Sequence, residues 1–216
     1  MLVFDLMTKD VITVTRETPV LDALKIIQEN DFRRLPVVDE DGRPVGVVSR
    51  KAIEALKPQS GIPSLWQIGS WAAKHTVGEV MNKRMVTIRP TDTVEIATAK
   101  AQSNKVGSLL VVDDGKLVGV VTTNDIFYKV VNPTLGVGET GTRVVVVGGG
   151  TGPNAENILG AINRLGVEVK VIWAIPSVTN KKTNLVVHLD TDDARNVVGE
   201  LTRLGYEARV VNRDYQ

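Results

Sequence analysis

Two stretches of the chain follow the same pattern, and this internal repeat limits the possible folds more than any other feature. The first copy contains LPVVD at 35–39 and VGVVS at 45–49, and the second contains LLVVD at 109–113 and VGVVT at 118–122. Corresponding positions lie 74 residues apart before the turn between the two runs (109 − 35) and 73 residues apart after it (118 − 45). Duplicated units of this size are expected to pack around a pseudo-twofold axis, with clefts between them.

Each copy predicts one α/β unit. A short extended segment is followed by an amphipathic helix, then by two strands joined at Asp41-Gly42 or Asp114-Gly115, and then by a second helix. In the second copy, Asp92 stands three residues before a glutamate, which predicts that Asp92 caps the amphipathic helix. Two such units would bury a shared α/β core.

The composition predicts a soluble, cytoplasmic protein. Of the 216 residues, 43% are hydrophobic, and 26 basic residues against 25 acidic ones give a net charge of +1. This balance argues against nucleic acid or an anionic membrane as a partner. The absence of cysteine excludes disulfides and thiolate metal sites, and no apolar run approaches the roughly 20 residues of a membrane span. With only two histidines, in different segments, we expect neither catalytic residues nor a metal site.

The second copy ends in a motif that the first lacks in part. Residues 119–125 read GVVTTND, which is glycine, two hydrophobic residues, a hydroxyl residue and, three positions on, an acid. This motif and the tandem repeat resemble the CBS domain, whose paired copies bind adenosine-containing ligands. The resemblance implies that Asp125 accepts hydrogen bonds from a ribose diol and that Thr122 faces a phosphate. The alternative is that Asp125 is only a favourable acid in the first turn of a helix.

The resemblance also implies the remaining walls of this site. The adenine is expected among five residues of the second copy, Met85, Val86, Thr87, Ser108 and Leu109. The phosphates are expected to meet basic residues of the first copy, Arg34 and Lys51 ahead of Arg33, because guanidinium and ammonium groups match phosphate oxygens. Alternatively, basic residues at the ends of strands and helices are ordinary solvated surface.

The related cleft is expected to be degenerate. Ala52 stands where the second copy has Asp125, and Gly107-Ser108 replace the arginine pair on the opposite wall. We therefore predict one competent nucleotide site per chain, although Ser49 leaves a hydroxyl in the other cleft.

Residues 64–74, between the copies, predict a helix that carries two tryptophans. This insert resembles the corresponding stretch of AcuB-type acetoin-utilisation proteins, which also carry a CBS pair followed by an ACT-like domain. The resemblance implies a link to acetoin or central carbon metabolism.

A second internal echo lies in the C-terminal part, where RLGVEVKV at 164–171 recurs as RLGYEARV at 203–210. Each predicts a helix that ends at glycine and a strand that follows, so this part is predicted to be a ferredoxin-like βαββαβ domain. It resembles the ACT domain, a regulatory module that often binds amino acids at subunit interfaces. An amino-acid site and a dimerisation or docking role both remain open.

The loop GGGTG at 148–152 follows a four-valine strand and is similar to a dinucleotide-binding fingerprint. The match is incomplete, because Pro153 or Ala155 takes the place of the third glycine and no acid ends the next strand. An NAD-dependent enzyme that uses this loop is therefore the least favoured reading.

The sequence thus predicts a mixed α/β (α+β) chain with five parts: a CBS repeat at 1–57, a helical linker at 58–76, a second CBS repeat at 77–131, a flexible linker at 132–141 and an ACT-like domain at 142–216. The leading hypothesis is a non-catalytic sensor, a homodimer, that binds an adenine nucleotide (AMP, ADP or ATP) in one cleft and relays this to the ACT-like domain and an unknown protein target. The basic residues favour a phosphate over S-adenosylmethionine. The rival is a dimerisation scaffold with vestigial clefts.

Overall fold

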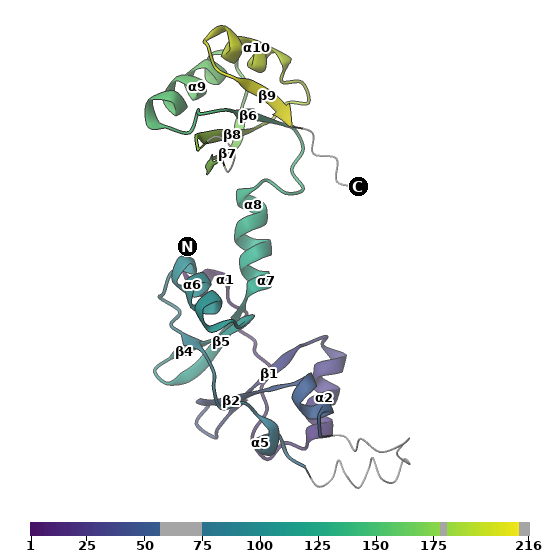
Figure 1. The fold of residues 1–216 in the computed structure, drawn as a ribbon. Coiled ribbons are helices and arrows are strands. Elements are labelled where there is room, and N and C mark those ends of the chain that lie inside the picture. The colour runs from purple at the N-terminus through teal and green to yellow at the C-terminus, as the bar shows by residue number, and fades with distance from the viewer. Residues whose placement is uncertain (57–74, 178–180, 212–216) are drawn as a thin grey trace. The chain divides into compact units, whose positions relative to one another are not determined.

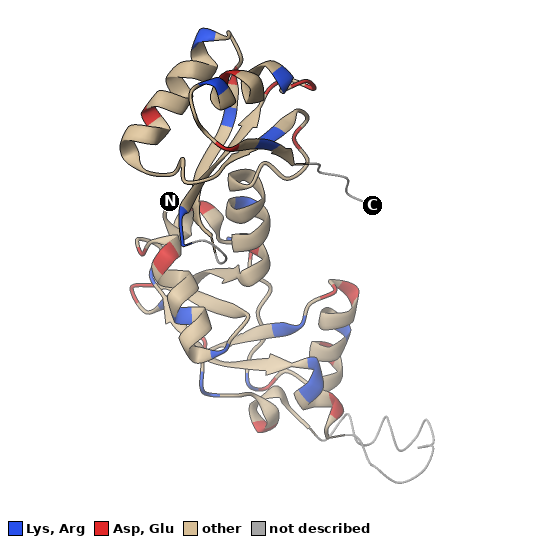
Figure 2. Ribbon diagram, turned by 45° about the horizontal axis from the view of Figure 1, so that its top comes forward, with Lys and Arg blue, Asp and Glu red and all other residues tan. Residues whose placement is uncertain are grey.

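The computed structural model of the chain describes residues 1–56, 75–177 and 181–211 (Figure 1). It divides into two compact units, Met1–Lys129 and Val130–Gln216. The helix predicted at 64–74 lies outside the described residues. Among the residues that are described, no helix is both long and apolar enough to cross a membrane. Acidic and basic residues are mixed along the ribbons of both units, in keeping with the balanced net charge (Figure 2).

The first unit contains both repeats. The elements of the first repeat are α1 (Val3–Leu6), α2 (Val20–Glu29), β1 (Arg34–Val38), β2 (Pro44–Ser49) and α3 (Arg50–Glu54). Those of the second are α5 (Val77–Val80), β3 (Thr87–Ile88), α6 (Val94–Asn104), β4 (Ser108–Asp113), β5 (Lys116–Thr122) and α7 (Thr123–Ile126). The π-helix η1 (Phe127–Val131) and α8 (Asn132–Thr134) follow. The two strands of each repeat form an antiparallel hairpin, as the sequence predicts.

The amphipathic helix of each repeat packs on its own hairpin. In α2 the buried positions are Val20, Ala23, Leu24 and Ile27, which recur at the spacing of one helical face. The extended segment before α2 is reduced to a single parallel bridge from Val14 to β1, whereas its counterpart in the second repeat forms the short strand β3, parallel to β4.

The predicted cap of α6 is wrong by one residue. The hydroxyl of Thr93 accepts the hydrogen bond from the amide of Ile96, so Thr93 is the N-cap. Asp92 instead accepts from the amide of Arg89 and pairs with its guanidinium at 2.8 Å. A nearby guanidinium gives Asp92 a charged partner, and this leaves the cap position to the neighbouring hydroxyl.

The two repeats exchange backbone hydrogen bonds in a reciprocal manner. Thr8 of the first repeat pairs with Val120 of β5 through two bonds of 2.9 and 3.0 Å. Asn82, the counterpart of Thr8, pairs in the same way with Val47 of β2, at 2.8 and 3.0 Å. Each repeat therefore places its N-terminal segment beside the closing strand of the other repeat, which is the pseudo-twofold arrangement predicted from the sequence.

A glycine in each closing strand allows this approach. A Cβ at Gly119 would lie 2.6 Å from the sulfur of Met7, and one at Gly46 would lie 2.8 Å from the sulfur of Met81. Side chains at these positions would push the repeats apart, so the glycine of the repeated VGVV sequence is explained by packing between the repeats.

The second unit is a four-stranded antiparallel sheet with two helices. Its elements are β6 (Thr142–Val146), α9 (Gly152–Arg164), β7 (Val169–Pro176), β8 (Thr183–Leu189), α10 (Arg195–Arg203) and β9 (Ala208–Val211). The strand order is β7-β8-β6-β9. Both helices lie on the same side of the sheet (Figure 1), where Ile158 and Ile162 of α9 and Leu201 of α10 join the core with Val144 and Val187.

The residues at 132–141, predicted as a flexible linker, begin with α8 and then contact the sheet of the second unit. The carbonyl of Leu135 accepts a hydrogen bond from Arg143 Nη2. The carbonyl of Thr140 lies 3.0 Å from Nε2 of His188, which is fully buried in β8. This segment therefore packs as part of the second unit.

The glycine loop at 148–150 is closely packed against its own unit. A Cβ at Gly149 would lie 2.7 Å from Ile158 Cδ1, and one at Gly150 would lie 2.6 Å from the Thr183 methyl group. The loop is also held from within, because Asn154 Nδ2 donates to the carbonyl of Gly148 at 3.1 Å. Packing against α9 and β8 thus explains these glycines without a bound dinucleotide.

Candidate functional site

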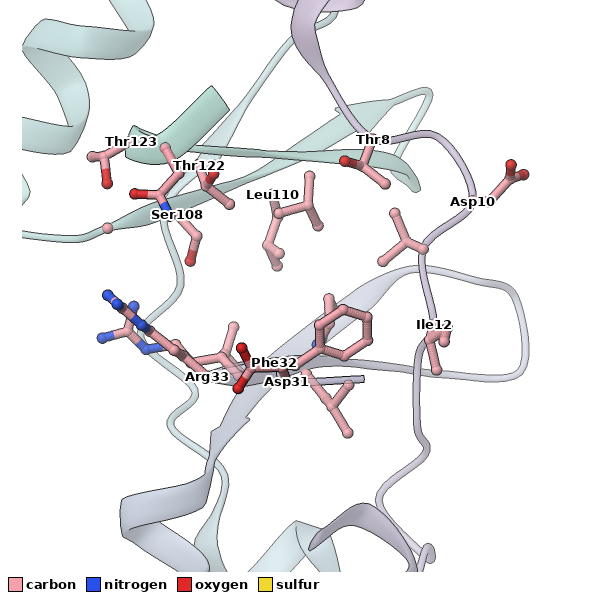
Figure 3. Close-up of a pocket in the computed structure, with 18 residues that line it drawn as sticks. Thr8, Asp10, Ile12, Asp31, Phe32, Arg33, Ser108, Leu110, Thr122 and Thr123 are labelled. Atoms are coloured by element: carbon pink, nitrogen blue, oxygen red, sulfur yellow. The ribbon is translucent and has the colours of Figure 1, made fainter. Parts of the chain in front are cut away.

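A cavity of about 520 Å³ lies between the two repeats (Figure 3). The first repeat lines it with Thr8, Asp10, Val11, Ile12, Asp31, Phe32, Arg33, Arg34, Leu35, Pro36 and Val47. The second repeat lines it with Gly107, Ser108, Leu110, Val120, Thr122, Thr123 and Asn124. The volume is within the range of small-molecule sites, roughly 300–1,000 Å³.

One end of the cavity is polar. Arg33 and Arg34 stand at the start of β1, and in Figure 3 the side chain of Arg33 points to the end where Ser108, Thr122 and Thr123 lie. Among the described residues, no carboxylate pairs with either guanidinium. The two free cations and the three hydroxyls together form a surface that suits an anion such as a phosphate.

Arg34 reaches from the first repeat to the second. A Cβ at Gly107 would lie 4.0 Å from Arg34 Nη1 and 3.9 Å from Thr123 Oγ1. Because these atoms meet at one small residue, the guanidinium of one repeat and the hydroxyl of the other face the same space. Glycine at 107 leaves that space open.

The other end of the cavity is mainly apolar. It is lined by Val11 and Ile12 of the segment before α2, by Phe32, by Pro36 of β1 and by Leu110 of β4. In Figure 3, Phe32 and Ile12 come from the first repeat and face Leu110 and Thr8 across the cavity. An aromatic ring and branched aliphatic side chains suit a flat, weakly polar group such as a nucleobase.

Asp125 stabilises the start of α7. Its Oδ2 accepts hydrogen bonds from the amide of Thr122 at 2.9 Å and from the Thr122 hydroxyl at 2.6 Å, and the Thr122 hydroxyl accepts one from the Asp125 amide at 3.1 Å. Its Oδ1 lies 2.9 Å from Nζ of Lys129. Burial raises the pKa of Asp125, but the hydrogen bonds from Thr122 and Lys129 outweigh burial and lower this pKa below its ordinary value of 3.8. The side chain is therefore a carboxylate at neutral pH.

The CBS domain model matches residues 3–55 and 77–132, which together are half of the chain. The chain belongs to the CBS-domain family. A CBS domain-containing protein of Dictyostelium discoideum is 31% identical over 137 residues, which are 61% of this chain and 94% of that protein. In the first curated relatives, by contrast, the match spans only 27%, 23% and 22% of the relative's length, and two of these three are named as enzymes.

Two solved structures resemble the CBS pair. CBSX2 in complex with AMP is 30% identical, with a TM-score of 0.51, over 61% of this chain and 96% of that chain; CBSX2 is a protein of Arabidopsis thaliana. A Vibrio cholerae protein named as an acetoin utilization protein (AcuB) is 26% identical, with a TM-score of 0.53, over 61% of this chain and 91% of that chain. Both likenesses leave a large C-terminal part of the chain without a counterpart.

Four of the ten predicted site residues line the cavity of the CBS pair: Arg33, Arg34, Ser108 and Thr122. Leu109 does not, because neighbouring residues of a strand face opposite ways: Ser108 and Leu110 line the cavity, and Leu109 is 1% exposed. Lys51 on α3 is exposed and is also not part of the lining. Asp125 is not among the lining residues, but it directly contacts Thr122, which is.

The three residues predicted around the adenine, Met85, Val86 and Thr87, are not part of this lining. Val11 and Ile12, their counterparts 74 residues earlier, line it instead. The cause is the exchange of N-terminal segments between the repeats, which brings Thr8 and the residues after it beside β5. The offset of 74 gives the candidates, but nothing in the sequence tells which of the two segments meets the closing motif.

Proposed function

We propose that the CBS pair binds an adenine nucleotide in the cavity between the repeats and that the chain is a non-catalytic, cytoplasmic regulatory protein. The observation that carries the proposal is the meeting of Arg33 and Arg34 of one repeat with Thr122 and Ser108 of the other at one end of the cavity. A ligand that fills the cavity must then present an anionic group at one end and an apolar, planar group at the other. AMP has these two groups, and CBSX2 has been solved in complex with AMP.

In this proposal the phosphate lies between the two arginines and the hydroxyls of Ser108 and Thr122. Each charge-assisted hydrogen bond of this kind contributes about 1.5–3 kcal/mol. The adenine lies against Ile12 and Phe32, and the ribose lies on the side of Asp125, next to Thr122. Lys51 stays a candidate for longer phosphate chains, since it is exposed on α3, directly after β2.

The experiment is isothermal titration of the full chain with AMP, ADP, ATP, adenosine, S-adenosylmethionine and NADH. Arg34→Ala is the test variant, and Arg43→Ala is its matched control, because Arg43 pairs with Asp41 at the exposed hairpin turn, away from the cavity. We expect AMP to bind, Arg34→Ala to weaken it about tenfold or more, and Arg43→Ala to leave it unchanged. Equal affinity for AMP and adenosine in the unmodified chain would contradict the phosphate assignment.

We also propose that the second unit is an ACT-like regulatory domain that receives the signal and serves in homodimerisation or docking to a protein target. The order strand, helix, strand, strand, helix, strand supports this assignment. Asn154 in its loop donates to the Gly148 carbonyl, which favours docking over an amino-acid ligand at that loop. The link to acetoin metabolism is a proposal that rests on the likeness to the Vibrio cholerae protein.

The rival function is a dimerisation scaffold whose cavity binds no ligand. Sedimentation of the chain with and without AMP separates the two. A sensor changes its association or shape when AMP is added, because the ligand must favour one arrangement over another. A scaffold sediments identically under both conditions.

A further inference from the structure

Lys129 already occupies the carboxylate that the proposed function assigns to the ribose. Its Nζ lies 2.9 Å from Asp125 Oδ1 and also donates to the backbone carbonyl of Leu6 at 2.6 Å. The other oxygen, Oδ2, accepts both the amide and the hydroxyl of Thr122. Both oxygens of Asp125 therefore have partners within the chain, and Oδ1 is held by a single side chain.

The first repeat lacks both members of this ion pair. With the offset of 73 residues, Ala52 corresponds to Asp125 (125 − 73) and Leu56 corresponds to Lys129 (129 − 73). Leu56 packs against the hydrophobic core of its repeat. The lysine is thus found in the repeat that carries the acid and not in the repeat that lost it.

The two partners of Asp125 differ in how easily they are displaced. The bonds from Thr122 form a capping box within one turn and fix the start of α7. The bond from Lys129 is an ion pair at the surface, with the lysine side chain 46% exposed and the Asp125 side chain 16% exposed. An ammonium group at such a site exchanges its carboxylate for water at little cost.

A ribose diol and the Lys129 ammonium group need the same acceptor. A diol donates two hydrogen bonds, and Oδ2 already accepts two, so the diol depends on Oδ1. We propose that Lys129 is an intrachain competitor of the ligand: a nucleotide gains Asp125 only when its ribose displaces the lysine. This inference rests on the proposed function, and it deepens it by naming the residue that tunes affinity.

Displacement of Lys129 also acts on the segment that leads to the second unit. Lys129 lies in the π-helix η1 and is the last residue of the first unit, and its bond to Leu6 ties that helix to α1. When the ligand releases Lys129, the bond to Leu6 is free to break as well. The competitor is therefore placed where a change of occupancy can be passed along the chain.

The test is titration of AMP and 2′-deoxy-AMP into the full chain and three variants. Lys129→Met removes the competitor, and Lys129→Gln keeps a donor for the Leu6 carbonyl without the charge. Lys25→Met is the matched control, because it removes another exposed ion pair at i,i+4 spacing, with Glu29 on α2. We expect both Lys129 variants to bind AMP about two- to fivefold more tightly, with a smaller gain for 2′-deoxy-AMP and no change for Lys25→Met.

Unchanged or weaker AMP binding by both Lys129 variants would overturn the inference and leave the proposed function intact. Absence of AMP binding in every variant would overturn both. An independent reading is the reactivity of Lys129 toward an amine-acylating reagent, followed by mass spectrometry with Lys25 as the internal standard. AMP should raise the reactivity of Lys129 relative to Lys25, and equal or lower reactivity would overturn the inference.

Discussion

The Thr122 hydroxyl donates a hydrogen bond of 2.6 Å to the Asp125 carboxylate and accepts one of 3.1 Å from the Asp125 amide. Thr122 lines the cavity of the CBS pair, and Asp125 does not. The acid of the closing motif therefore acts on the cavity at least through Thr122, whose orientation it fixes. Any direct contact with a ribose adds to this structural role, so the two roles must be separated by measurement.

Asp125→Ala is expected to lower the free energy of unfolding by about 1 kcal/mol, because it removes the capping box of α7. It should also abolish most AMP binding. Thr93→Ala is the control, since it removes the cap of α6, outside the cavity. It should cost similar stability in urea denaturation and leave AMP affinity unchanged. If Asp125→Ala loses stability and keeps its AMP affinity, the residue is only a helix cap.

Ile12→Ala is expected to weaken AMP binding by about fivefold, because it removes apolar area of roughly 1 kcal/mol from the adenine end of the cavity. Ile12 is partly exposed, so the variant should fold normally. Met85→Ala is the decisive comparison, since the family resemblance puts the adenine at Met85, outside the cavity lining. A larger loss for Met85→Ala would move the nucleotide to the opposite cleft.

Arg33→Ala is expected to weaken AMP about 10- to 100-fold and to leave adenosine within twofold, because the lost contacts are charge-assisted bonds to phosphate. Lys51→Ala should leave AMP unchanged, as Lys51 does not line the cavity. Titration with AMP and ATP in parallel decides the role of Lys51. A loss confined to ATP would assign Lys51 to the outer phosphates.

Acid is expected to remove the stabilisation that Asp125 provides. Burial raises the pKa of Asp125, but the bonds from Thr122 and Lys129 hold it below 3.8 in the folded chain. A group with a lowered folded pKa stabilises the protein fully above its unfolded pKa and loses this contribution as pH falls through the folded one. The difference in Tm between the natural chain and Asp125→Asn should therefore be constant from about pH 5 to 7 and shrink below about pH 4. A constant difference down to about pH 2 would contradict this.

Gly149→Ala is expected to lower the free energy of unfolding of the second unit by about 1–3 kcal/mol, because the added Cβ would lie 2.7 Å from Ile158 Cδ1. Gly152→Ala is the matched control, since a Cβ there meets nothing within 4 Å, and its effect should stay within about 0.5 kcal/mol. Thermal unfolding followed by circular dichroism measures both. NADH binding that depends on Gly152 would revive the dinucleotide reading of this loop.

Much of the fold could be predicted because its signals are local. The glycines of the hairpin turns, Gly42 and Gly115, have positive φ angles of 79° and 78°, which explains why the same residue recurs in both copies. The buried face of α2 follows directly from the spacing of its apolar residues. The cap of α6 could not be predicted, because Asp92 and Thr93 both suit the position and the choice depends on where Arg89 reaches.

The sequence by itself determined the two repeats, their hairpins, the CBS family and the asymmetry between Asp125 and Ala52. Only the tertiary structure decided which surfaces meet: that the segment after Thr8, and not the one after Asn82, borders the cavity with Thr122, and that Lys129 holds Asp125. The physical reason is that periodicity, turns and caps depend on neighbours within a few residues. The two candidate segments share the same local pattern, and the choice between them rests on backbone pairing and side-chain packing between residues far apart in the chain.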